Sequence, residues 1–565
     1  MNYKQEIAKQ LAGVIDFLSA EEIEAILEVP KDRGMGDFAF PCFRLAKTLR
    51  KAPPMIAQDL LEAFDAQAPI SKVEAVGGYL NFTLDKVGFV KGVLDAVMEQ
   101  GEKYGSKQLG HGKNVVIDYS APNIAKPFHV GHLRSTVIGN ALYKIYGFEG
   151  YNPIGVNHLG DWGKQFGMLI AAYKHWGDDK ALEDEPIKAL LDLYVKIHAE
   201  LDEHPEYEEE GRAWFKALED GNEEAQRLWK WFVDLSLVEF NRIYDMLGVS
   251  FDHFTGESFY NDKMEAVVEE IKDKDLLVES EGAYVVDLGE EMPPCIILKR
   301  DGATIYATRD ITAALYRKKT FDFEKCIYIT DYAQDLHFQQ WFKVVKLMGY
   351  DWADDLMHES FGRVSTEQGK LQTRKGNVIL LDDLLNQSIG KVQAIIEDRN
   401  PNLENKEDVA KAVGIGAVIF NDLSNNKIRD IVFNWDRMLS FDGETGPYVQ
   451  YTHARACSVL RKSGETAYAE SIDYEQLMDP ASLEVVQELA TFPDVVEQAM
   501  LRNEPSLITR KIVLIAQRFN KFYHDCPILV DDEVLKGTRL ALVRAVKTVL
   551  ATGLDLLGIQ APEKM

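Results

Sequence analysis

Cysteine is scarce in this chain, and its five occurrences lie far apart, at Cys42, Cys295, Cys326, Cys457 and Cys526. Such scattered cysteines give neither the paired spacing of a zinc site nor the framework of a disulfide-stabilised secreted domain. Long apolar runs are also absent: no stretch is apolar for the length that a membrane-spanning helix needs. The first residues, MNYKQEIAKQL, lack the apolar core of a secretory signal. We therefore expect a cytoplasmic protein with reduced thiols and no membrane partner.

Positive charge is in deficit, because 63 Lys and Arg stand against 91 Asp and Glu, for a net charge of −28. This balance does not favour a polyanionic partner such as RNA. The charge is uneven, however: acidic residues crowd 182–224, whereas 501–547 carries nine Lys or Arg against five acidic residues. Because salt confines the field of surface charges to about 8–10 Å, a local basic face still permits RNA binding.

The segment from Asp118 to Thr136, DYSAPNIAKPFHVGHLRST, carries the strongest local signals. It follows an apolar run at 115–117 that predicts a strand, passes through a polar loop with prolines, and enters a predicted helix near Leu133. In an open parallel sheet, ligands bind where strands end and helices begin. The segment is therefore expected to form a binding corner at the edge of such a sheet.

Two histidines flank a glycine in this corner, at His129, Gly131 and His132, and Lys126 precedes them. Imidazole N–H donors, exposed backbone amides and the positive end of a helix dipole suit a polyphosphate, with Gly131 leaving room for a close ligand. The four-residue pattern alone is weak. It also fits a structural helix cap or two metal ligands, although no third His or Cys stands at a useful spacing.

Longer stretches of the chain resemble a known family. The segment SAPNIAKPFHVGHLRST (120–136) is similar to the signature of class I aminoacyl-tRNA synthetases, and specifically of the arginyl-tRNA synthetase family. Further similar stretches follow in the family's order, at 157–167, 301–302, 306–310, Gln334 with His337 and Phe338, 369–377 and 448–455.

The resemblance implies an α/β fold, with a Rossmann-like parallel-sheet catalytic domain, an N-terminal α/β domain and a C-terminal all-helical anticodon-binding bundle. Apolar runs at 114–118, 295–300 and 325–330 alternate with helical stretches, which fits a parallel sheet with crossover helices. Near the N-terminus, VEAVGGYLNFTL (73–84) predicts two strands joined by a glycine turn. The expected parts are an N-terminal tRNA-contacting domain (1–112), the catalytic domain (113–380) with an insertion at about 176–295, a helical region contacting the tRNA stem (381–445) and a helical anticodon-binding domain (446–565).

The resemblance also assigns an L-arginine pocket to Asp118, Asn123, Tyr306, Asp310 and Gln334. The residue types are consistent with that role, because a guanidinium group demands paired acceptors, which the two aspartates supply. Tyr306 stands one helical turn before Asp310, and the two amides suit the α-amino and carboxylate ends. Each residue by itself also has a structural explanation. Asp310, for example, is a plausible salt-bridge partner for Arg309 or Arg317.

The implied reaction is ATP-dependent ligation of L-arginine to its cognate tRNA through an arginyl-adenylate. ATP is a substrate, bound at His129, Gly131 and His132, whose imidazoles would donate to phosphoryl oxygens. Mg²⁺ would enter with ATP and bridge the leaving phosphates, and no metal site formed by the protein is expected.

The chain departs from the class I pattern Lys-Met-Ser-Lys, because residues 370–373 are Lys-Leu-Gln-Thr and lack the second lysine. Members of the family that lack this lysine commonly carry one at the position of Lys126. We therefore assign Lys126 to the α-phosphate side and Lys370 to the pyrophosphate side. Lys375, in the same loop, is the alternative source of the missing charge.

Basic and aromatic residues interleave along the predicted C-terminal helices, as a reader of an anticodon loop requires. The resemblance assigns tRNA contacts to Tyr448, Tyr451, Arg455 and Tyr523. The same spacing suits aromatic core positions for any single tyrosine.

Two rival functions come from other classes. One is another nucleotidyltransferase with the H-x-G-H pattern, such as a cysteine-specific synthetase or a small-molecule ligase. The other is a catalytically silent RNA-binding paralogue. The scattered cysteines, the predicted helical C-terminal part and the presence of both histidines and both aspartates favour the synthetase, which is expected to act as a monomer.

Overall fold

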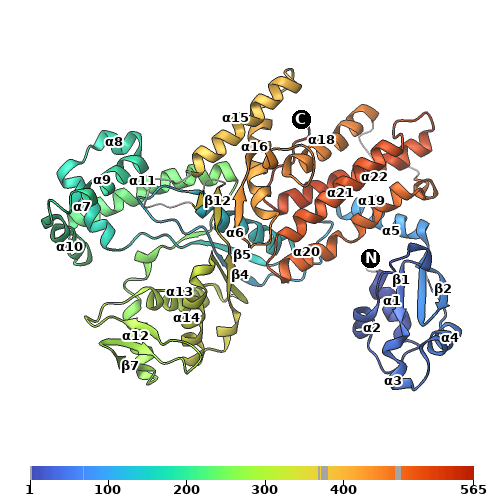
Figure 1. Ribbon diagram of the computed structural model, residues 1–565, viewed down its shortest axis with the longest axis horizontal. Helices are drawn as coiled ribbons and strands as arrows, with labels where there is room; N and C mark the ends of the chain where they lie inside the picture. Colours follow the sequence, from blue (N-terminus) through green and yellow to red (C-terminus); the bar gives the residue numbers. More distant parts are fainter. Residues whose placement is uncertain (1–2, 68, 367–368, 371–379, 465–471) are drawn as a thin grey trace. The chain divides into compact units, whose positions relative to one another are not determined.

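The computed structural model describes residues 3–67, 69–366, 369–370, 380–464 and 472–565 (Figure 1). The chain divides into two compact units. The larger unit consists of residues 105–455, 493–513 and 550–565, and the smaller unit consists of residues 1–104, 456–492 and 514–549.

The centre of the larger unit is a five-stranded parallel sheet in the order β11-β10-β4-β5-β6. Its strands are β4 (Asn114–Asp118), β5 (Asn152–Asn157), β6 (His253–Phe254), β10 (Lys325–Asp331) and β11 (Leu356–Phe361). The strands predicted at 114–118 and 325–330 are thus confirmed as β4 and β10, and the structure pairs them as parallel neighbours. The strand order reverses between these two, so their carboxyl ends open onto the crevice where such sheets bind ligands.

Helices cover this sheet and bury an apolar core. They include α6 (Val130–Phe148), α7 (Lys164–Trp176), α13 (Tyr306–Phe321) and α14 (Asp335–Leu347). Val116 of the sheet, Ile311 of α13 and Trp341 of α14 are fully buried in this core. Helix α6 lies so close to the residue after β4 that a Cβ on Gly139 would stand 2.2 Å from the ring of Tyr119.

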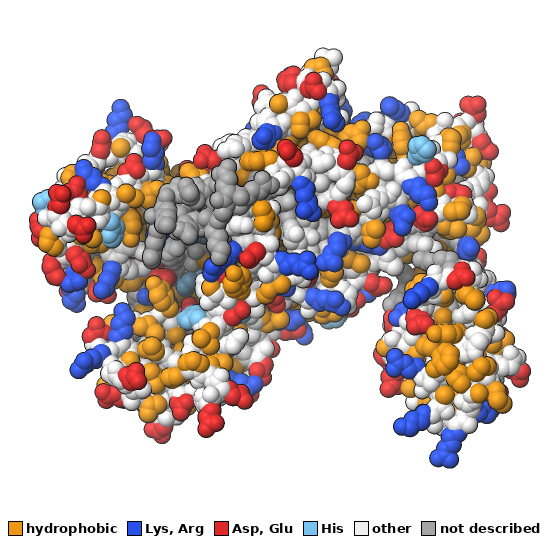
Figure 2. Space-filling view, viewed as in Figure 1, with side chains coloured by type: hydrophobic (Ala, Val, Ile, Leu, Met, Phe, Trp, Pro, Cys, Tyr) orange, Lys and Arg blue, Asp and Glu red, His pale blue; other side chains and the backbone are white. Residues whose placement is uncertain are grey.

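The insertion is helical in its first part and contains strands in its second. Its elements are α8 (Asp179–Asp184), α9 (Pro186–Ala199), α10 (Glu206–Glu219), α11 (Glu223–Leu247), α12 (Met264–Asp273), β7 (Leu277–Ser280), β8 (Ala283–Val286) and β9 (Cys295–Leu298). The strand predicted at 295–300 exists as β9, but it belongs to a separate antiparallel sheet, β7-β8-β9, and not to the parallel one. Figure 2 shows acidic side chains over α10, where Glu206, Glu208 and Glu209 are exposed.

A small sheet and further helices complete the larger unit. They are β12 (Val364–Thr366), β13 (Gly369–Lys370), β14 (Ile431–Phe433), α15 (Leu381–Arg399), α16 (Lys406–Leu423) and α17 (Trp435–Met438). In the small sheet, β12 runs parallel to β14 and antiparallel to β13. The described strands β12 and β13 flank residues 367–368.

The N-terminal part of the smaller unit is an α/β domain with the sheet β1-β3-β2. Its elements are α1 (Tyr3–Ala12), α2 (Ala20–Ile26), β1 (Phe38–Pro41), α3 (Ala46–Leu49), α4 (Pro53–Ala63), β2 (Ile70–Val76), β3 (Tyr79–Leu84) and α5 (Lys86–Gln100). The predicted glycine turn is confirmed, because Val76 pairs with Tyr79 across Gly77 and Gly78, and Gly77 has a φ of 65°.

The C-terminal part of the chain is helical, as expected. Its helices are α18 (Gly446–Ser463), α19 (Pro480–Ala490), α20 (Phe492–Leu501), α21 (Ser506–Asp525) and α22 (Glu533–Leu556). All five cysteines are free and buried. Within the described ranges, none of the helices combines the length and the apolar character needed to cross a bilayer.

Replacing Gly139 by alanine tests the packing of α6 on Tyr119. We expect Gly139→Ala to lower the free energy of unfolding by about 1–3 kcal/mol, because overpacking outweighs the better helix propensity of alanine. Gly390→Ala is the matched control, since Gly390 is an exposed residue of α15 with open space around it. Chemical denaturation should show a small gain of roughly 0.5–1 kcal/mol for this control. Equal effects of the two substitutions would contradict the packing described here.

Candidate active site

The loop that follows β4 has an unusual backbone. Ser120, Ala121 and Ala125 have positive φ angles of 72°, 46° and 59°. Such conformations cost of order 1–3 kcal/mol each for residues other than glycine, and they persist only where neighbouring structure imposes them. Contacts with other parts of the structure must therefore hold the loop in this conformation.

Hydroxyl groups from two helices hold this loop. The amide of Ser120 donates to Ser135 Oγ of α6 (2.9 Å), and the amide of Ala125 donates to Ser236 Oγ of α11 (3.1 Å). Thr136 Oγ1 of α6 lies 2.8 Å from Ser120 Oγ, which also lies 2.8 Å from the hydroxyl of Tyr244. Four polar side chains distant in sequence thus fix the path of the chain toward the histidines.

The two histidines cap α6 reciprocally. His129 is the N-cap, and its Nδ1 accepts from the amide of Gly131 at 3.0 Å. The Nδ1 of His132 accepts from the amide of His129 at 3.2 Å, and the two rings stack with centroids 3.9 Å apart. Because each Nδ1 accepts a hydrogen bond, the proton of each neutral imidazole lies on Nε2. The pair therefore presents two Nε2–H donors.

Both imidazoles are neutral at pH 7. Burial lowers the pKa of His129 below its ordinary value, and the charge of Lys126 acts in the same direction. Burial lowers the pKa of His132 well below 6.5, helped by His129 and Lys126. The positive charge at this corner must accordingly come from lysine, and Lys126 is half-buried in the loop.

The backbone around Gly131 differs from what the sequence suggested. A Cβ on Gly131 would stand 2.7 Å from Cε1 of His129, so the space that glycine leaves is filled by this imidazole and not left for a ligand. The amides of His129 and Gly131 donate to the imidazoles, and the amide of His132 donates to the carbonyl of His129. These three amides are engaged, so the expectation of exposed amides fails here. The imidazole Nε2–H groups are the candidate donors to a ligand at this corner.

Each predicted arginine-binding aspartate has a partner within the protein. Asp118, the last residue of β4, lies 2.8 Å through Oδ2 from Nη2 of Arg317, which is 1% exposed. Asp310 of α13 lies 2.6 Å through Oδ2 from Nε2 of His337 on α14. The alternative pairing of Asp310 with Arg309 or Arg317 is therefore not the one observed. Both contacts use one carboxylate oxygen and leave Oδ1 for another donor.

The other predicted pocket residues are exposed. Tyr306, in the first turn of α13, is 69% exposed, and Gln334 is exposed just before α14. Asn123 is exposed beside Gly160, where a Cβ would stand 2.3 Å from its Oδ1. Gly160 thus allows the loop after β4 to approach the segment that follows β5.

Sequence reasoning missed one acid of this region, Glu257. Its carboxylate lies 3.6 Å from Nη1 of Arg309, the residue before Asp310. Burial raises the pKa of Glu257 to about 7, against the effect of Arg309, and the charges of Asp161 and Asp310 raise it further. The segment around Glu257 carries no motif, and only the fold places it against α13.

The lysine loop is described only in part. The backbone of Lys370 lies in β13, where it pairs with Ser365 of β12. Lys375 falls within residues 371–379, outside the described residues. Its assignment stays a prediction.

The candidate tRNA-binding residues occupy two helices. On α18, Tyr448 is half-buried and Tyr451 is 41% exposed, with the guanidinium of Arg455 4.9 Å from the Tyr451 ring centroid. Tyr523 of α21 is 43% exposed. Tyr451 and Tyr523 are therefore not core residues.

Comparison with known families covers nearly the whole chain. The family described as tRNA synthetases class I (R), catalytic domain, matches residues 93–435. The arginyl tRNA synthetase N terminal domain matches residues 1–84, and the DALR anticodon binding domain matches residues 449–565.

Individual relatives match over their full length. The chain is 58% identical over 565 residues to an arginine–tRNA ligase of Alkaliphilus metalliredigens and 54% identical to one of Clostridioides difficile, with 100% of each chain covered. The structure of Thermus thermophilus arginyl-tRNA synthetase superposes with a TM-score of 0.82 at 26% identity, covering 99% of both chains. Together with the histidine-capped corner at the switch point of a parallel sheet, these matches show that the chain belongs to the arginyl-tRNA synthetase family of class I aminoacyl-tRNA synthetases.

Proposed function

We propose that the chain ligates L-arginine to its cognate tRNA in two steps. Arginine first reacts with ATP to give arginyl-adenylate and pyrophosphate, and the arginyl group then passes to a ribose hydroxyl at the tRNA 3′ end, releasing AMP. The observation that carries the proposal is the pair of neutral imidazoles with Nε2–H donors at the sheet's switch point. A silent paralogue is disfavoured, because both histidines and both aspartates are present.

Adenylate formation needs positioned donors more than a base. The arginine carboxylate is already ionised when it attacks the α-phosphorus, so catalysis comes from alignment and from neutralising charge on the phosphoryl oxygens. We assign this task to the Nε2–H groups of His129 and His132, with Lys126 on the α-phosphate side and Lys370 on the pyrophosphate side. The capping bonds orient both rings in advance, so little reorganisation is needed during the reaction.

Mg²⁺ is proposed to enter as the ATP complex, held mainly by phosphate oxygens and neutralising charge on the leaving group. His129, His132 and Lys126 fit this arrangement, because hydrogen-bond donors and a cation would hold the phosphate oxygens and leave Mg²⁺ to the phosphates. In the described part of the chain, the one cluster with metal-ligand spacing is Glu200, Glu203 and His204, in the insertion.

The arginine pocket is proposed to form around the free oxygens of Asp118 and Asp310. A guanidinium presents several N–H groups in one plane, and two carboxylates that each offer Oδ1 match this geometry. Glu257 would add negative charge, while Tyr306, Asn123 and Gln334 orient the rest of the substrate. Hydrogen-bonding sites of this kind reject substrates that lack the matching donors.

We assign the remaining parts of the chain to tRNA binding. We propose that residues 1–112 and 446–565 contact the tRNA, with Tyr448, Tyr451, Arg455 and Tyr523 among the contacts, and that 381–445 lies against its stem. An exposed tyrosine stacked with an arginine, as Tyr451 is with Arg455, suits an unpaired base and its phosphate. We further propose that the enzyme acts in the cytoplasm as a monomer.

Removing one imidazole donor should slow activation. We expect His132→Ala to lower the rate of ATP–pyrophosphate exchange, with arginine and tRNA present, by about 10²–10³, or roughly 3–4 kcal/mol. His204→Ala, at an exposed position of the insertion, is the control that should exchange normally. A near-normal rate for a folded His132→Ala protein would remove the histidines from the mechanism.

The source of the missing loop charge can be decided by two alanine variants. Lys126→Ala should reduce adenylate formation by about 10²–10³, because it removes a cation from the phosphate site. Lys375→Ala should reduce it by less than about fivefold, the effect expected of a solvated charge. Single-turnover measurement of arginyl-adenylate compares them directly, and the reverse order would transfer the role to Lys375.

Arginine binding should depend on pH through Glu257. Its pKa of about 7 means that the side chain is neutral below this pH and ionised above it. We therefore expect kcat/KM for arginine to rise as pH increases from about 6 to about 8, since this parameter reports the free enzyme. Glu257→Gln should flatten the rise and increase the KM for arginine roughly tenfold at high pH. Exposed Glu269→Gln is the control. A Glu257→Gln enzyme that keeps the wild-type pH profile would exclude this role.

A further inference from the structure

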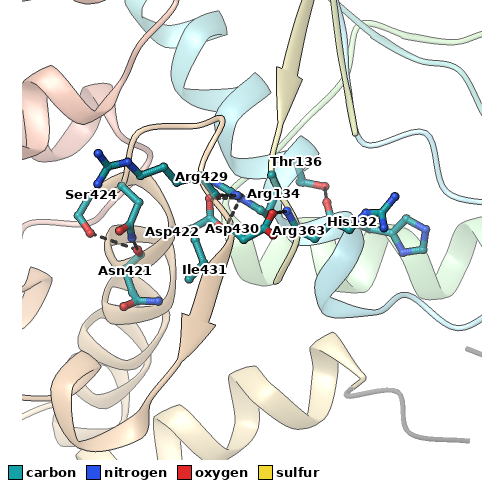
Figure 3. A network of polar contacts seen from close by, with 12 residues as sticks. His132, Arg134, Thr136, Arg363, Asn421, Asp422, Ser424, Arg429, Asp430 and Ile431 are labelled. Carbon is teal, nitrogen blue, oxygen red and sulfur yellow. Dashed lines mark hydrogen bonds and ion pairs between the residues drawn. The ribbon is translucent and has the colours of Figure 1, made fainter. Parts of the chain in front are cut away.

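Arg134 is a fully buried arginine two residues after His132, and nothing in the reaction described above uses it. It is 0% exposed. Its Nη1 donates to the carbonyl of Gly362 at 2.8 Å and to the carbonyl of Arg429 at 2.7 Å. Its Nε lies 3.3 Å from the carboxylate of Asp422 (Figure 3). One side chain of α6 thus contacts three segments that are distant in sequence.

The acceptors of Arg134 lie where two strands of the small sheet begin. Gly362 separates β11 from β12, and Arg429 precedes β14. The two segments touch so closely that a Cβ on Gly362 would stand 2.4 Å from the carbonyl carbon of Arg429. The amide of Arg363 donates to Asp430 Oδ1 at 2.7 Å, and the parallel ladder β12–β14 starts at the next residue. Arg134 therefore contacts both segments at the point where β12 and β14 begin to pair.

The small sheet connects this contact to the lysine side of the nucleotide site. β12 pairs with β13, which contains the backbone of Lys370. The helix that begins with the two imidazoles is thus joined, through one guanidinium, to the sheet that carries Lys370. Within α6, the hydroxyl of Thr136 donates to the carbonyl of His132 (Figure 3).

Stability alone does not account for a buried arginine at this place. Desolvating a guanidinium and a carboxylate costs several kcal/mol, and apolar residues of similar volume often stabilise a core equally well or better. Asp422 shows this cost, because burial raises its pKa despite the opposing charge of Arg134. Among the side chains, a planar fork is suited to reach two carbonyls and a carboxylate together, whereas lysine is a point charge. The contacts of Arg134 are therefore suited to fixing the position of α6 relative to the segments that precede β12 and β14.

We propose that Arg134 is a positioning residue that sets the spacing between the two imidazoles on α6 and the strand carrying Lys370. The inference rests on the proposed roles of His129, His132 and Lys370. In-line phosphoryl transfer requires both sides of the nucleotide at once, and a misplacement of about 1 Å costs on the order of 10²-fold in rate. Arg134 acts through its neighbours and does not touch the nucleotide.

Two variants separate positioning from stability. Arg134→Lys keeps the charge and loses the fork, and the double variant Arg134→Met with Asp422→Leu replaces the buried pair by apolar side chains. We expect both to lower kcat of ATP–pyrophosphate exchange by about 10²-fold, with the dissociation constant for arginine within about twofold of wild type and the double variant at least as heat-stable. Lys107→Met, which breaks an ion pair with Glu497 in the same unit, is the control and should keep its kcat. A double variant with near-normal kcat would overturn the proposal.

Coupling to Lys370 supplies a readout that a purely structural residue would not move. Lys370→Ala should slow exchange strongly in the wild-type background and only slightly in the Arg134→Lys background, because a misplaced lysine has little left to contribute. Additive losses would overturn the proposal. His132→Ala separates a failure of the proposed nucleotide site from a failure of the positioning role. A normal rate for His132→Ala would refute the nucleotide site itself, whereas a slow His132→Ala beside a normal Arg134→Lys would refute the positioning role alone.

Discussion

The reciprocal hydrogen bonds between the two histidines and the first amides of α6 are the constraint on which the site depends. They satisfy amides that have no partner within the helix, and they decide which nitrogen of each ring carries the proton. Burial then keeps both rings neutral by lowering the pKa of each. The corner therefore offers directed neutral donors, and positive charge has to be supplied separately by lysine side chains. Gly131 belongs to the same device, since any larger residue would meet the ring of His129.

The acids that we propose for the neighbouring arginine pocket each have a basic side chain as a partner. The carboxylate of Asp118 lies beside Arg317, that of Asp310 beside His337, and that of Glu257 beside Arg309. A buried carboxylate without a partner is costly, so these contacts keep the acids oriented in the absence of substrate. Each aspartate still has an oxygen to offer a planar cation. Burial is the main cause that raises the pKa of Glu257 to about 7, and the charges of Asp161 and Asp310 raise it further against the effect of Arg309.

The acidic balance of the whole chain is compatible with a polyanionic substrate, because charge acts locally. The acidic helices of the insertion expose their carboxylates to solvent, where they act over about a Debye length. The corner that we propose to bind the nucleotide, by contrast, contains Lys126 and the two imidazole donors, and on α18 Arg455 stacks on Tyr451. The net charge of −28 is therefore a property of the whole chain and does not give the local charge at the proposed binding sites.

Local patterns allowed much of the fold to be predicted. The apolar runs of β4 and β10, the glycine turn between β2 and β3, and the helices of the C-terminal part all have signatures within a few residues. The partner of a strand has no such signature, which is why β9 was predicted as a strand but assigned to the wrong sheet. The sequence by itself determined the family and the types of elements such as β4, β10 and the C-terminal helices, and it supplied candidate site residues. Only the tertiary structure decided that Asp118 lies beside Arg317, that Glu257 lies beside Arg309 and that Arg134 contacts three segments. The physical reason is that the free energy of a buried charge depends on what long-range folding brings within a few ångströms of it.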